Sequence, residues 1–298
     1  PWSIYEVIPG VSFRSAAARH EPPPAAGPFP LIVFSHGRTG MRYAYSMLCE
    51  ALAARGAIVV SADHPGDVLS DWITGRHVDD RTNEINRVND AHALLAELRP
   101  GGGLLDSELI AAIDHDRVAL AGHSYGAYTA LATAAGARGV PAHDRVGAVV
   151  GLQPFTRSMS DRALRRVNVP SLLVVADRDT TTPASSDADR PWSLMPGRPA
   201  WRADLSGAGH QAASDLSLYA DLVRQLPLLP APVRQYLEYA TSDADGPSIR
   251  PWRAVLTDQV RVTWAFLQVA LDLDPGQGSA TAASLAEADG LTLRMRRS

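Results

Sequence analysis

A serine stands at the centre of the pentapeptide Gly122-His123-Ser124-Tyr125-Gly126, between an apolar run at 118–121 and a small-residue stretch at 127–135. This order predicts a strand, a tight turn that carries the serine, and a helix. Side chains two positions before or after the serine would collide with the neighbouring strand or helix, which explains the glycines. The pattern favours nucleophilic attack by Ser124.

A nucleophilic serine needs a base, and the chain order favours His210. Sites of this kind place serine, acid and histidine in that order along the chain, and His143 and His210 are the histidines that follow Ser124. His143 comes too soon after the predicted serine helix to follow another strand end. His210 ends a glycine-containing loop after the strand-like run 203–205, so we expect it to be the base.

The acid is expected to be one of two aspartates, Asp177 and Asp179. Both follow the apolar run 172–176, at the carboxyl end of a predicted strand, where α/β sheets place their chemistry. Alternation along the strand does not separate them, because they would share a face. Asp179 lies farther out on the loop, from which a carboxylate can reach the imidazole while Asp177 braces the turn. We favour Asp179 and keep Asp177 as the alternative.

The oxyanion of a tetrahedral intermediate needs hydrogen-bond donors, and two backbone N–H groups are candidates. Tyr125 supplies the first, directly after the nucleophile. We expect the second from Arg38, in a loop where Gly37 and Gly40 allow a close approach to the reacting carbonyl. The Arg38 guanidinium could also pair with a substrate carboxylate, and the alternative is a solvated side chain whose amide alone matters.

Short apolar runs alternate with longer helical patterns, which predicts an α/β fold with a mainly parallel central sheet flanked by helices. The predicted strands are 31–34, 57–61, 118–121, 148–152 and 171–176, and the predicted helices are 43–55, 83–98, 125–135 and 255–271. Residues 4–14 are expected to form an antiparallel edge segment. No internal repeat is evident, so we expect residues 1–298 to form a single domain.

Two segments stand outside this framework. Residues 65–82 are predicted to form a long polar loop that carries Trp72, and residues 211–250 form an insertion before the C-terminal helix. The insertion contains an apolar, proline-stiffened run at 226–233 that is typical of a cap over a pocket. We expect both segments to restrict access to the site.

The composition, with 298 residues, 46% hydrophobic side chains and a net charge of −4, indicates a soluble globular protein. Nucleic acid is not an expected partner, because the basic cluster Arg294, Arg296 and Arg297 is interpreted as a solvated tail. The single cysteine, Cys49, cannot form an intrachain disulfide and is expected to pack in the core.

No apolar stretch approaches the length that spans a bilayer, and no histidine or cysteine spacing suggests a metal. We therefore expect no membrane span, no metal and no cofactor, and a monomer. The sequence does not fix the compartment: cytoplasm is favoured over secretion, and removal of a leader before Pro1 stays an open alternative.

Taken together, these segments resemble the α/β-hydrolase superfamily, and within it the group of dienelactone-hydrolase-like proteins, platelet-activating-factor acetylhydrolases and cutinase-like polyester hydrolases. The resemblance spans about residues 29–212 and is carried by 34–37, 61–66, the serine pentapeptide, 176–183 and 209–210. In the polyester hydrolases the acid precedes a Thr-x-x-Pro element, which matches Asp179. The acetylhydrolases take their acid from the preceding strand end, where this chain has Gln153, so the resemblance implies that the acid has moved.

The resemblance also implies substrate contacts. Phe155 occupies the place where polyester hydrolases present a tryptophan, and Trp72, Trp192 and Trp201 lie in segments that border the predicted mouth. Core packing is the alternative for each of them. Dienelactone hydrolases use a cysteine nucleophile, so Ser124 argues against that activity.

The expected function is hydrolysis of a small-molecule carboxylic ester through an acyl-enzyme, with Ser124, His210 and Asp179 as the catalytic residues. An amidase, a thioesterase or an acyltransferase with the same three residues is the alternative. A catalytically silent binding protein on the same fold is a further alternative, and the presence of all three residues argues against it.

Overall fold

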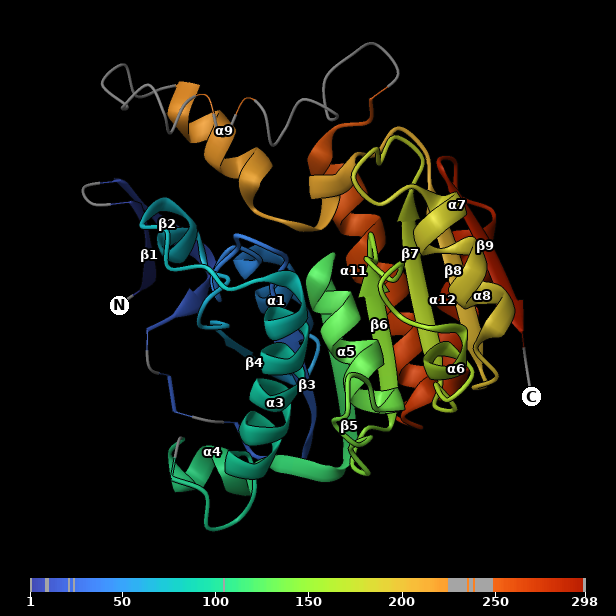
Figure 1. The fold of residues 1–298 in the computed structure, drawn as a ribbon, viewed down its shortest axis with the longest axis horizontal. Coiled ribbons are helices and arrows are strands. Elements are labelled where there is room, and N and C mark those ends of the chain that lie inside the picture. Colours follow the sequence, from blue (N-terminus) through green and yellow to red (C-terminus); the bar gives the residue numbers. More distant parts are fainter. Residues whose placement is uncertain are drawn as a thin grey trace.

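The computed structural model describes residues 2–8, 11–20, 22–23, 25–103, 105–224, 235, 238 and 249–296. Within these residues a seven-stranded sheet has the order β4-β3-β5-β6-β7-β8-β9 (Figure 1). Neighbouring strands are parallel except for the antiparallel pair β8 and β9. The strands are β3 (Phe29–Ser35), β4 (Ile58–Ala62), β5 (Ile113–His123), β6 (Ala148–Leu152), β7 (Ser171–Ala176), β8 (Ala200–Leu205) and β9 (Leu291–Arg296).

The central strands form from continuous apolar runs because helices cover both faces of the sheet. All residues of β6 and β7 are buried, as is the C-terminal half of β5. The five strands predicted from these runs are confirmed, and the fold is an α/β fold of the α/β-hydrolase type.

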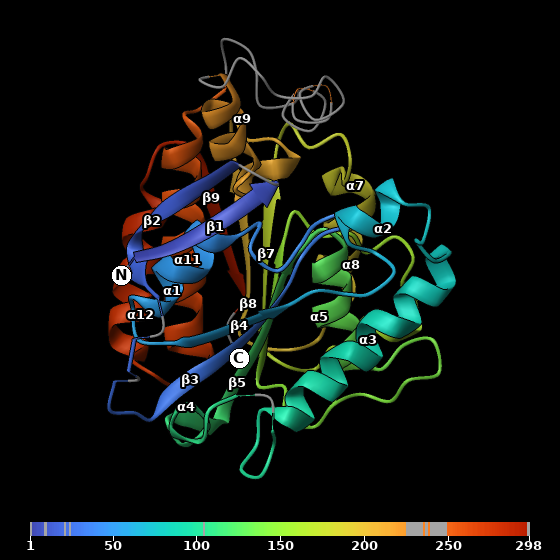
Figure 2. The ribbon, with the colours of Figure 1, turned by 90° about the vertical axis from the view of Figure 1, so that its left-hand side faces the viewer.

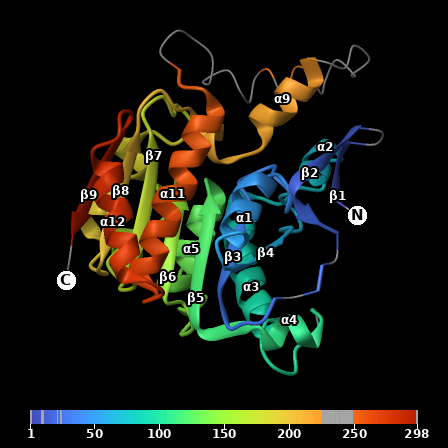
Figure 3. The same cartoon turned by 180° about the vertical axis from the view of Figure 1, so that it is seen from behind.

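Helices divide between the two faces of the sheet, which Figure 1 and Figure 3 show from opposite sides. One face packs against α1 (Ser46–Ala53), α11 (Trp252–Ala270) and α12 (Pro275–Ala286). The other packs against α3 (Asp80–Glu97), α5 (Tyr125–Ala135), α6 (Asp161–Leu164) and α8 (Asp189–Leu194). Shorter helices are α2 (Leu69–Ile73), α4 (Ser107–Ala111), α7 (Ala184–Asp187), the 3₁₀ helix η1 (His210–Ala213) and α9 (Leu216–Arg224).

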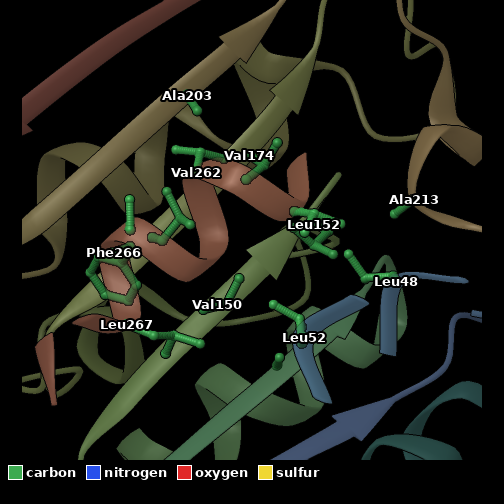
Figure 4. Packing of buried hydrophobic residues seen from close by; sticks show 14 of the residues in the cluster. Leu48, Leu52, Val150, Leu152, Val174, Ala203, Ala213, Val262, Phe266 and Leu267 are labelled. Carbon is green, nitrogen blue, oxygen red and sulfur yellow. The ribbon is translucent and has the colours of Figure 1, made fainter. Parts of the chain in front are cut away.

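In the core on the α11 face, apolar side chains of the sheet pack against apolar side chains of α11. Val150, Leu152 and Val174 point from the sheet toward Val262 and Phe266 of α11, and all five are fully or almost fully buried (Figure 4). Burial of one such side chain contributes roughly 1.5–3 kcal/mol. This packing fixes the strands whose ends carry the site.

The N-terminal segment departs from the prediction. β1 (Trp2–Ile8) and β2 (Val11–Arg19) are antiparallel, as expected, but they form a sheet of their own beside α1, so their placement at an edge of the main sheet was wrong (Figure 2). The Tyr5 and Ser15 hydroxyls donate to the Glu50 carboxylate of α1, at 2.7 and 2.6 Å. These bonds tie the hairpin to a helix instead of a strand.

The C-terminal basic residues also differ from the prediction. Arg294 and Arg296 belong to β9, which pairs with β8, so their interpretation as a solvated tail was wrong. Arg294 donates to the Asp204 carboxylate at 2.8 Å, and Arg296 donates to the Trp192 carbonyl oxygen at 2.7 Å. Arg297 lies outside the described residues.

The two segments outside the framework contain helices. Residues 65–82 include α2 and the start of α3, whose N-cap Asp79 accepts a hydrogen bond from the Thr82 N–H, so the predicted long loop was wrong. In the insertion the structure describes η1 and α9, whereas the run 226–233 lies outside the described residues. Cys49 is partly buried against the α11-side core.

Strand register decides which loops meet at the carboxyl edge of the sheet. Ser35 of β3 pairs with Gly122 of β5, so the loop after β3 emerges beside the serine turn. Ala176 of β7 pairs with Leu205 of β8, so the loops that carry Asp179 and His210 emerge side by side.

Candidate functional site

Ser124 lies on a strained turn between β5 and α5. Its φ of 54° and ψ of −118° are rare for a residue with a side chain, and such strain costs of the order of 1–3 kcal/mol. A Cβ on Gly122 would lie 2.3 Å from the backbone of Gly126, and a Cβ on Gly126 would lie 1.9 Å from the Ser35 carbonyl oxygen. Only glycine fits at either position.

The side chains of Ser124, His210 and Asp179 are linked by hydrogen bonds, with His210 between the other two. His210 Nε2 lies 3.1 Å from Ser124 Oγ, and His210 Nδ1 lies 2.7 Å from Asp179 Oδ2. Because a carboxylate only accepts, Nδ1 carries the proton and Nε2 is left to accept from the serine hydroxyl. All three residues are buried, with exposed fractions of 6–7%.

The loop after β7 is folded around the Asp179 carboxylate. Its Oδ1 accepts the N–H groups of Thr181 and Thr182, at 2.9 and 2.7 Å, and its Oδ2 accepts the Thr182 hydroxyl at 2.6 Å. Burial acts to raise the pKa of Asp179, but the bonds from His210 and Thr182 outweigh it and lower the pKa below the ordinary value. Asp179 is thus ionised and fixed beside the imidazole.

Asp177 lies elsewhere on the same loop. Its side chain is exposed and accepts the Ala208 N–H at 3.2 Å, while its own N–H donates to the Leu205 carbonyl. It braces the turn between β7 and the loop that carries His210.

Two backbone N–H groups beside Ser124 are available as donors. Tyr125 occupies the first position of α5, where an N–H has no partner within the helix. Within the described residues, neither the Tyr125 N–H nor the Arg38 N–H donates to another protein group.

The direction of the Arg38 N–H is set by the preceding peptide group. The Gly37 carbonyl oxygen accepts from His36 Nδ1 at 2.7 Å and from Arg87 Nη2 at 3.2 Å. In a trans peptide the carbonyl and the following N–H point in opposite directions. The bonds to Gly37 therefore turn the Arg38 N–H away from His36 and Arg87.

Arg87 is a fully buried cation at the base of this loop. It donates to Asp67 Oδ2 at 2.9 and 2.7 Å and to the His36 carbonyl at 2.8 Å. Asp67 also accepts from Asn83 and Trp72, at 2.8 and 3.0 Å. The sequence analysis missed this network, whose members carry no motif apart from His36, a residue of the 34–37 segment.

The Arg38 side chain already has partners within the chain. Its Nη2 donates to Asp80 Oδ1 at 2.6 Å, and its Nε lies 3.7 Å from Asp67 Oδ1. The Arg38 guanidinium, which could pair with a substrate carboxylate according to the sequence, is thus balanced by two aspartates of the same protein.

A cavity of about 370 Å³ opens at Ser124 and His210. Part of its wall is apolar and part is hydroxyl- and amide-bearing. The apolar residues are Met41, Ala44, Leu69 and Leu216, with Tyr45 and Tyr219; the polar ones include Thr39, Thr180, Thr181, Gln211 and Ser214. Leu69 comes from the 65–82 segment, and Leu216 and Tyr219 come from α9 in the insertion.

The four aromatic side chains considered as substrate contacts do not line this cavity. Phe155 stacks on Tyr125 with ring centroids 4.2 Å apart. Trp72 stacks on His77, at 4.1 Å, and Trp192 lies under the Arg296 guanidinium, on the core of the α5 face. Trp201 packs in the opposite core.

A second serine, histidine and aspartate share the hydrogen-bond pattern of the first set. His64 Nδ1 lies 2.9 Å from Asp90 Oδ2, and His64 Nε2 lies 3.2 Å from Ser35 Oγ. Burial, followed by the charge of Arg87, lowers the pKa of His64 well below its ordinary value. Ser35 and His64 are buried and do not line the cavity.

Comparison with models of protein families shows to which family the chain belongs. Residues 20–174, more than half of the sequence, match the model of the Chlorophyllase family. The chain belongs to the Chlorophyllase family. This family is part of the α/β-hydrolase superfamily, so the resemblance to that superfamily is confirmed and the chain is a hydrolase of the α/β-hydrolase type. The narrower group of polyester hydrolases and acetylhydrolases stays a prediction.

The Chlorophyllase match includes Arg38, Ser124 and Tyr125 and ends before Asp179 and His210. The assignment of the acid and the base therefore depends on their geometry.

No helix in the described ranges is long and apolar enough to cross a membrane. The described side chains include no group of three or more histidine, cysteine or acidic residues arranged to hold a metal ion.

Proposed function

We propose that this chain is a carboxylic-ester hydrolase that works through Ser124, His210 and Asp179. The observation that carries the proposal is the hydrogen-bonded sequence Ser124–His210–Asp179 at a cavity large enough for a small organic ester. Membership of the Chlorophyllase family supports an ester substrate.

In the proposed mechanism, His210 Nε2 removes the Ser124 hydroxyl proton while Oγ attacks the ester carbonyl carbon. Asp179 holds Nδ1–H and stabilises the imidazolium that forms. The imidazolium then protonates the leaving alcohol as the carbon–oxygen bond breaks, which leaves an acyl group on Ser124. A water molecule, deprotonated by His210, hydrolyses this acyl-enzyme and restores the serine.

The N–H groups of Tyr125 and Arg38 are the proposed donors to the oxyanion. Preorganised donors of this kind each contribute about 10²–10³-fold to kcat. The Gly37 carbonyl contacts with His36 and Arg87 support this role for Arg38, because they orient the next amide before substrate arrives.

The cavity supports an uncharged ester with at least one apolar arm. Among its lining residues, all of which the structure describes, Arg38 is the permanently charged side chain and is paired with Asp80. Met41, Leu69 and Leu216 offer an apolar wall. The family's name refers to the ester of chlorophyll, so chlorophyll belongs in the substrate panel as a candidate.

The test is hydrolysis of p-nitrophenyl esters from acetate to palmitate, and of chlorophyll, by the wild type and by Ser124→Ala. We expect turnover by the wild type alone, with equal thermal melting of the two proteins. A fluorophosphonate probe should label the wild type and not Ser124→Ala. Turnover of matched amides or thioesters in preference to esters would favour the amidase or the thioesterase. Transfer of the acyl group to an added alcohol would favour the acyltransferase. A folded wild type that is neither labelled nor active would refute the proposal.

A further inference from the structure

His123, the residue before the proposed nucleophile, makes two buried hydrogen bonds that the mechanism above does not use. Its Nε2 lies 2.7 Å from the backbone carbonyl oxygen of His210. Its Nδ1 lies 2.8 Å from the hydroxyl oxygen of Tyr45. The ring is 1% exposed, so water does not compete for either bond.

The partners fix the direction of both bonds. A carbonyl oxygen only accepts, so His123 Nε2 carries the proton and donates to His210. Nδ1 is then an acceptor and takes the Tyr45 hydroxyl proton. The Tyr45 oxygen in turn accepts the Gly37 N–H at 3.1 Å. One directed chain therefore runs from the Gly37 N–H through Tyr45 and His123 to the His210 carbonyl.

This chain of hydrogen bonds joins the three segments that the proposed mechanism uses together. Gly37 precedes Arg38, whose N–H is a proposed oxyanion donor. His123 precedes Ser124, and the third segment carries His210. The Gly37 residue is thereby held from two sides, through its N–H by Tyr45 and through its carbonyl by His36 and Arg87. Ring contact between His123 and His210, with centroids 4.7 Å apart, adds to the link.

Protonation of His123 would break the bond from the Tyr45 hydroxyl, because a charged ring has no acceptor for the Tyr45 proton. Burial, followed by repulsion from His210, lowers the pKa of His123 to about 3. The ring therefore stays neutral at the pH of an esterase assay, including the step in which His210 is cationic.

We infer that His123 is a positioning residue: through Tyr45 and the His210 carbonyl it sets the base and the oxyanion loop relative to Ser124. The inference rests on the proposed function. Misplacement of reacting groups by about 1 Å can cost about 10²-fold in rate, which sets the scale of the expected effect.

Two substitutions at His123 separate its two bonds. In His123→Asn the side-chain oxygen stands near the Nδ1 position and can accept from Tyr45, but the amide does not reach the His210 carbonyl. In His123→Gln the longer side chain brings its amide nitrogen near the Nε2 position and can donate to His210. Tyr45→Phe removes the hydroxyl between Gly37 and His123. Tyr128→Phe, which removes the hydroxyl of another buried tyrosine, in the core on the α5 face of the sheet, is the matched control.

The measurements are kcat and KM for a p-nitrophenyl ester, the rate of Ser124 labelling by a fluorophosphonate, and thermal melting. We expect His123→Asn and Tyr45→Phe to lower kcat about 10- to 100-fold with KM changed by less than about threefold. His123→Gln keeps the bond to His210 but leaves no acceptor at the Nδ1 position for the Tyr45 hydroxyl, so its loss of kcat should not exceed that of Tyr45→Phe. Tyr128→Phe should keep the wild-type kcat.

Three outcomes would overturn the inference: wild-type kcat in His123→Asn, wild-type kcat in Tyr45→Phe, or a loss in Tyr128→Phe as large as that in Tyr45→Phe. If the His123 variants fail to fold, Tyr45→Phe with its Tyr128→Phe control decides the outcome. Failure of the proposed function is distinguishable, because it appears as a wild type without turnover. In that case the labelling rates of Ser124 in the same variants still test the positioning role.

Discussion

The guanidinium of Arg38 lies 4.3 Å from the centroid of the Tyr125 ring. The two residues whose backbone N–H groups are the proposed oxyanion donors are thus also in contact through their side chains. Trp72 lies on the same guanidinium, with its ring centroid 5.4 Å away, and Asp80 neutralises the charge. The Tyr125 ring therefore links the loop after β3 to the start of α5, and Asp80 links the same loop to the start of α3.

Replacement of Arg38 should loosen this contact and impair the proposed oxyanion donors. Because a cation stacked on an aromatic ring contributes roughly 0.5–2 kcal/mol, we expect Arg38→Ala to lower kcat about 10-fold with a smaller change in KM. Arg42→Ala is the control, since Arg42 lies nearby but pairs with Asp63 at the surface. Equal kinetics of the two variants would contradict a role for the stack.

The glycines of the serine turn should not tolerate alanine. A Cβ on Gly122 or Gly126 would lie within 2.3 Å of backbone atoms, which side-chain rotation cannot relieve. We expect each Gly→Ala variant to lose more than about 4 kcal/mol of unfolding free energy, or not to fold. Gly103→Ala should remain near wild type, because apart from its chain neighbours no described residue has an atom within 4 Å of the new Cβ. Urea unfolding checks this, and near-wild-type stability of Gly126→Ala would contradict the close approach of Gly126 to Ser35.

The two aspartates after β7 should differ strongly in their effect on activity. Asp179→Asn removes the acceptor that holds His210 Nδ1–H, and a change of this kind lowers kcat by about 10⁴-fold in a related triad. Asp177→Asn should change kcat by less than about threefold, because among the described residues its carboxylate accepts only the Ala208 N–H of the adjoining loop. Comparison of kcat for the two variants is the measurement. A larger loss in Asp177→Asn would reassign the acid.

Leu69 of α2 should limit the length of the ester. It lines the cavity, so Leu69→Trp is expected to fill apolar space and lower kcat/KM for palmitate at least about 10-fold more than for acetate. Ile73, on the same helix, is 75% exposed, and Ile73→Trp should leave the chain-length profile unchanged. The ratio of kcat/KM for the two esters checks the prediction, and an unchanged ratio in Leu69→Trp would show that α2 does not shape the pocket in use.

Asp215 should make stability depend on pH. This fully buried carboxylate accepts the Ser46 N–H and hydroxyl at the start of α1, at 2.7 and 2.5 Å, and so ties α9 to the body. Burial raises the pKa of Asp215 from 3.8 to about 6 in the folded state. The folded state then binds the proton more tightly than the unfolded state, so the contribution of Asp215 to stability falls as the pH rises from 4 to 6.

The measurement is the difference in unfolding free energy between the wild type and Asp215→Asn from pH 4 to pH 7. We expect the wild type to lose about 3 kcal/mol relative to the variant over this interval. Asp116→Asn, at an exposed position, serves as the control. A difference that is constant with pH would contradict the raised pKa.

Local pattern was enough for the central strands, because a strand buried on both faces leaves a continuous apolar run. It also predicted the strand ends after which Ser124, Asp179 and His210 lie. The edges of the fold were not predictable in this way. β9 (Leu-Thr-Leu-Arg-Met-Arg) alternates apolar with polar residues, and its arginines are held by Asp204 and by the Trp192 carbonyl, partners about 90 to 100 residues away in the sequence.

The supporting groups of the site were equally hidden. Arg87 acts on the Gly37 carbonyl from a helix about 50 residues away, and nothing in its local sequence distinguishes it from a surface arginine of α3. The aromatic residues Trp72 and Trp192 were singled out by type, whereas the cavity wall is made of Met41, Leu69 and Leu216, which resemble any other core residue in sequence.

The set Ser35, His64 and Asp90 has a consequence for how hydrolases are recognised from their structures. A search template that consists of a serine oxygen, an imidazole and a carboxylate fits this chain twice. Only the set at Ser124 combines that geometry with open space at the oxygen and with unoccupied amide donors in the described structure. Templates that include the space and the donors would reject the Ser35 set, and those that count three side chains would report two active sites in one molecule.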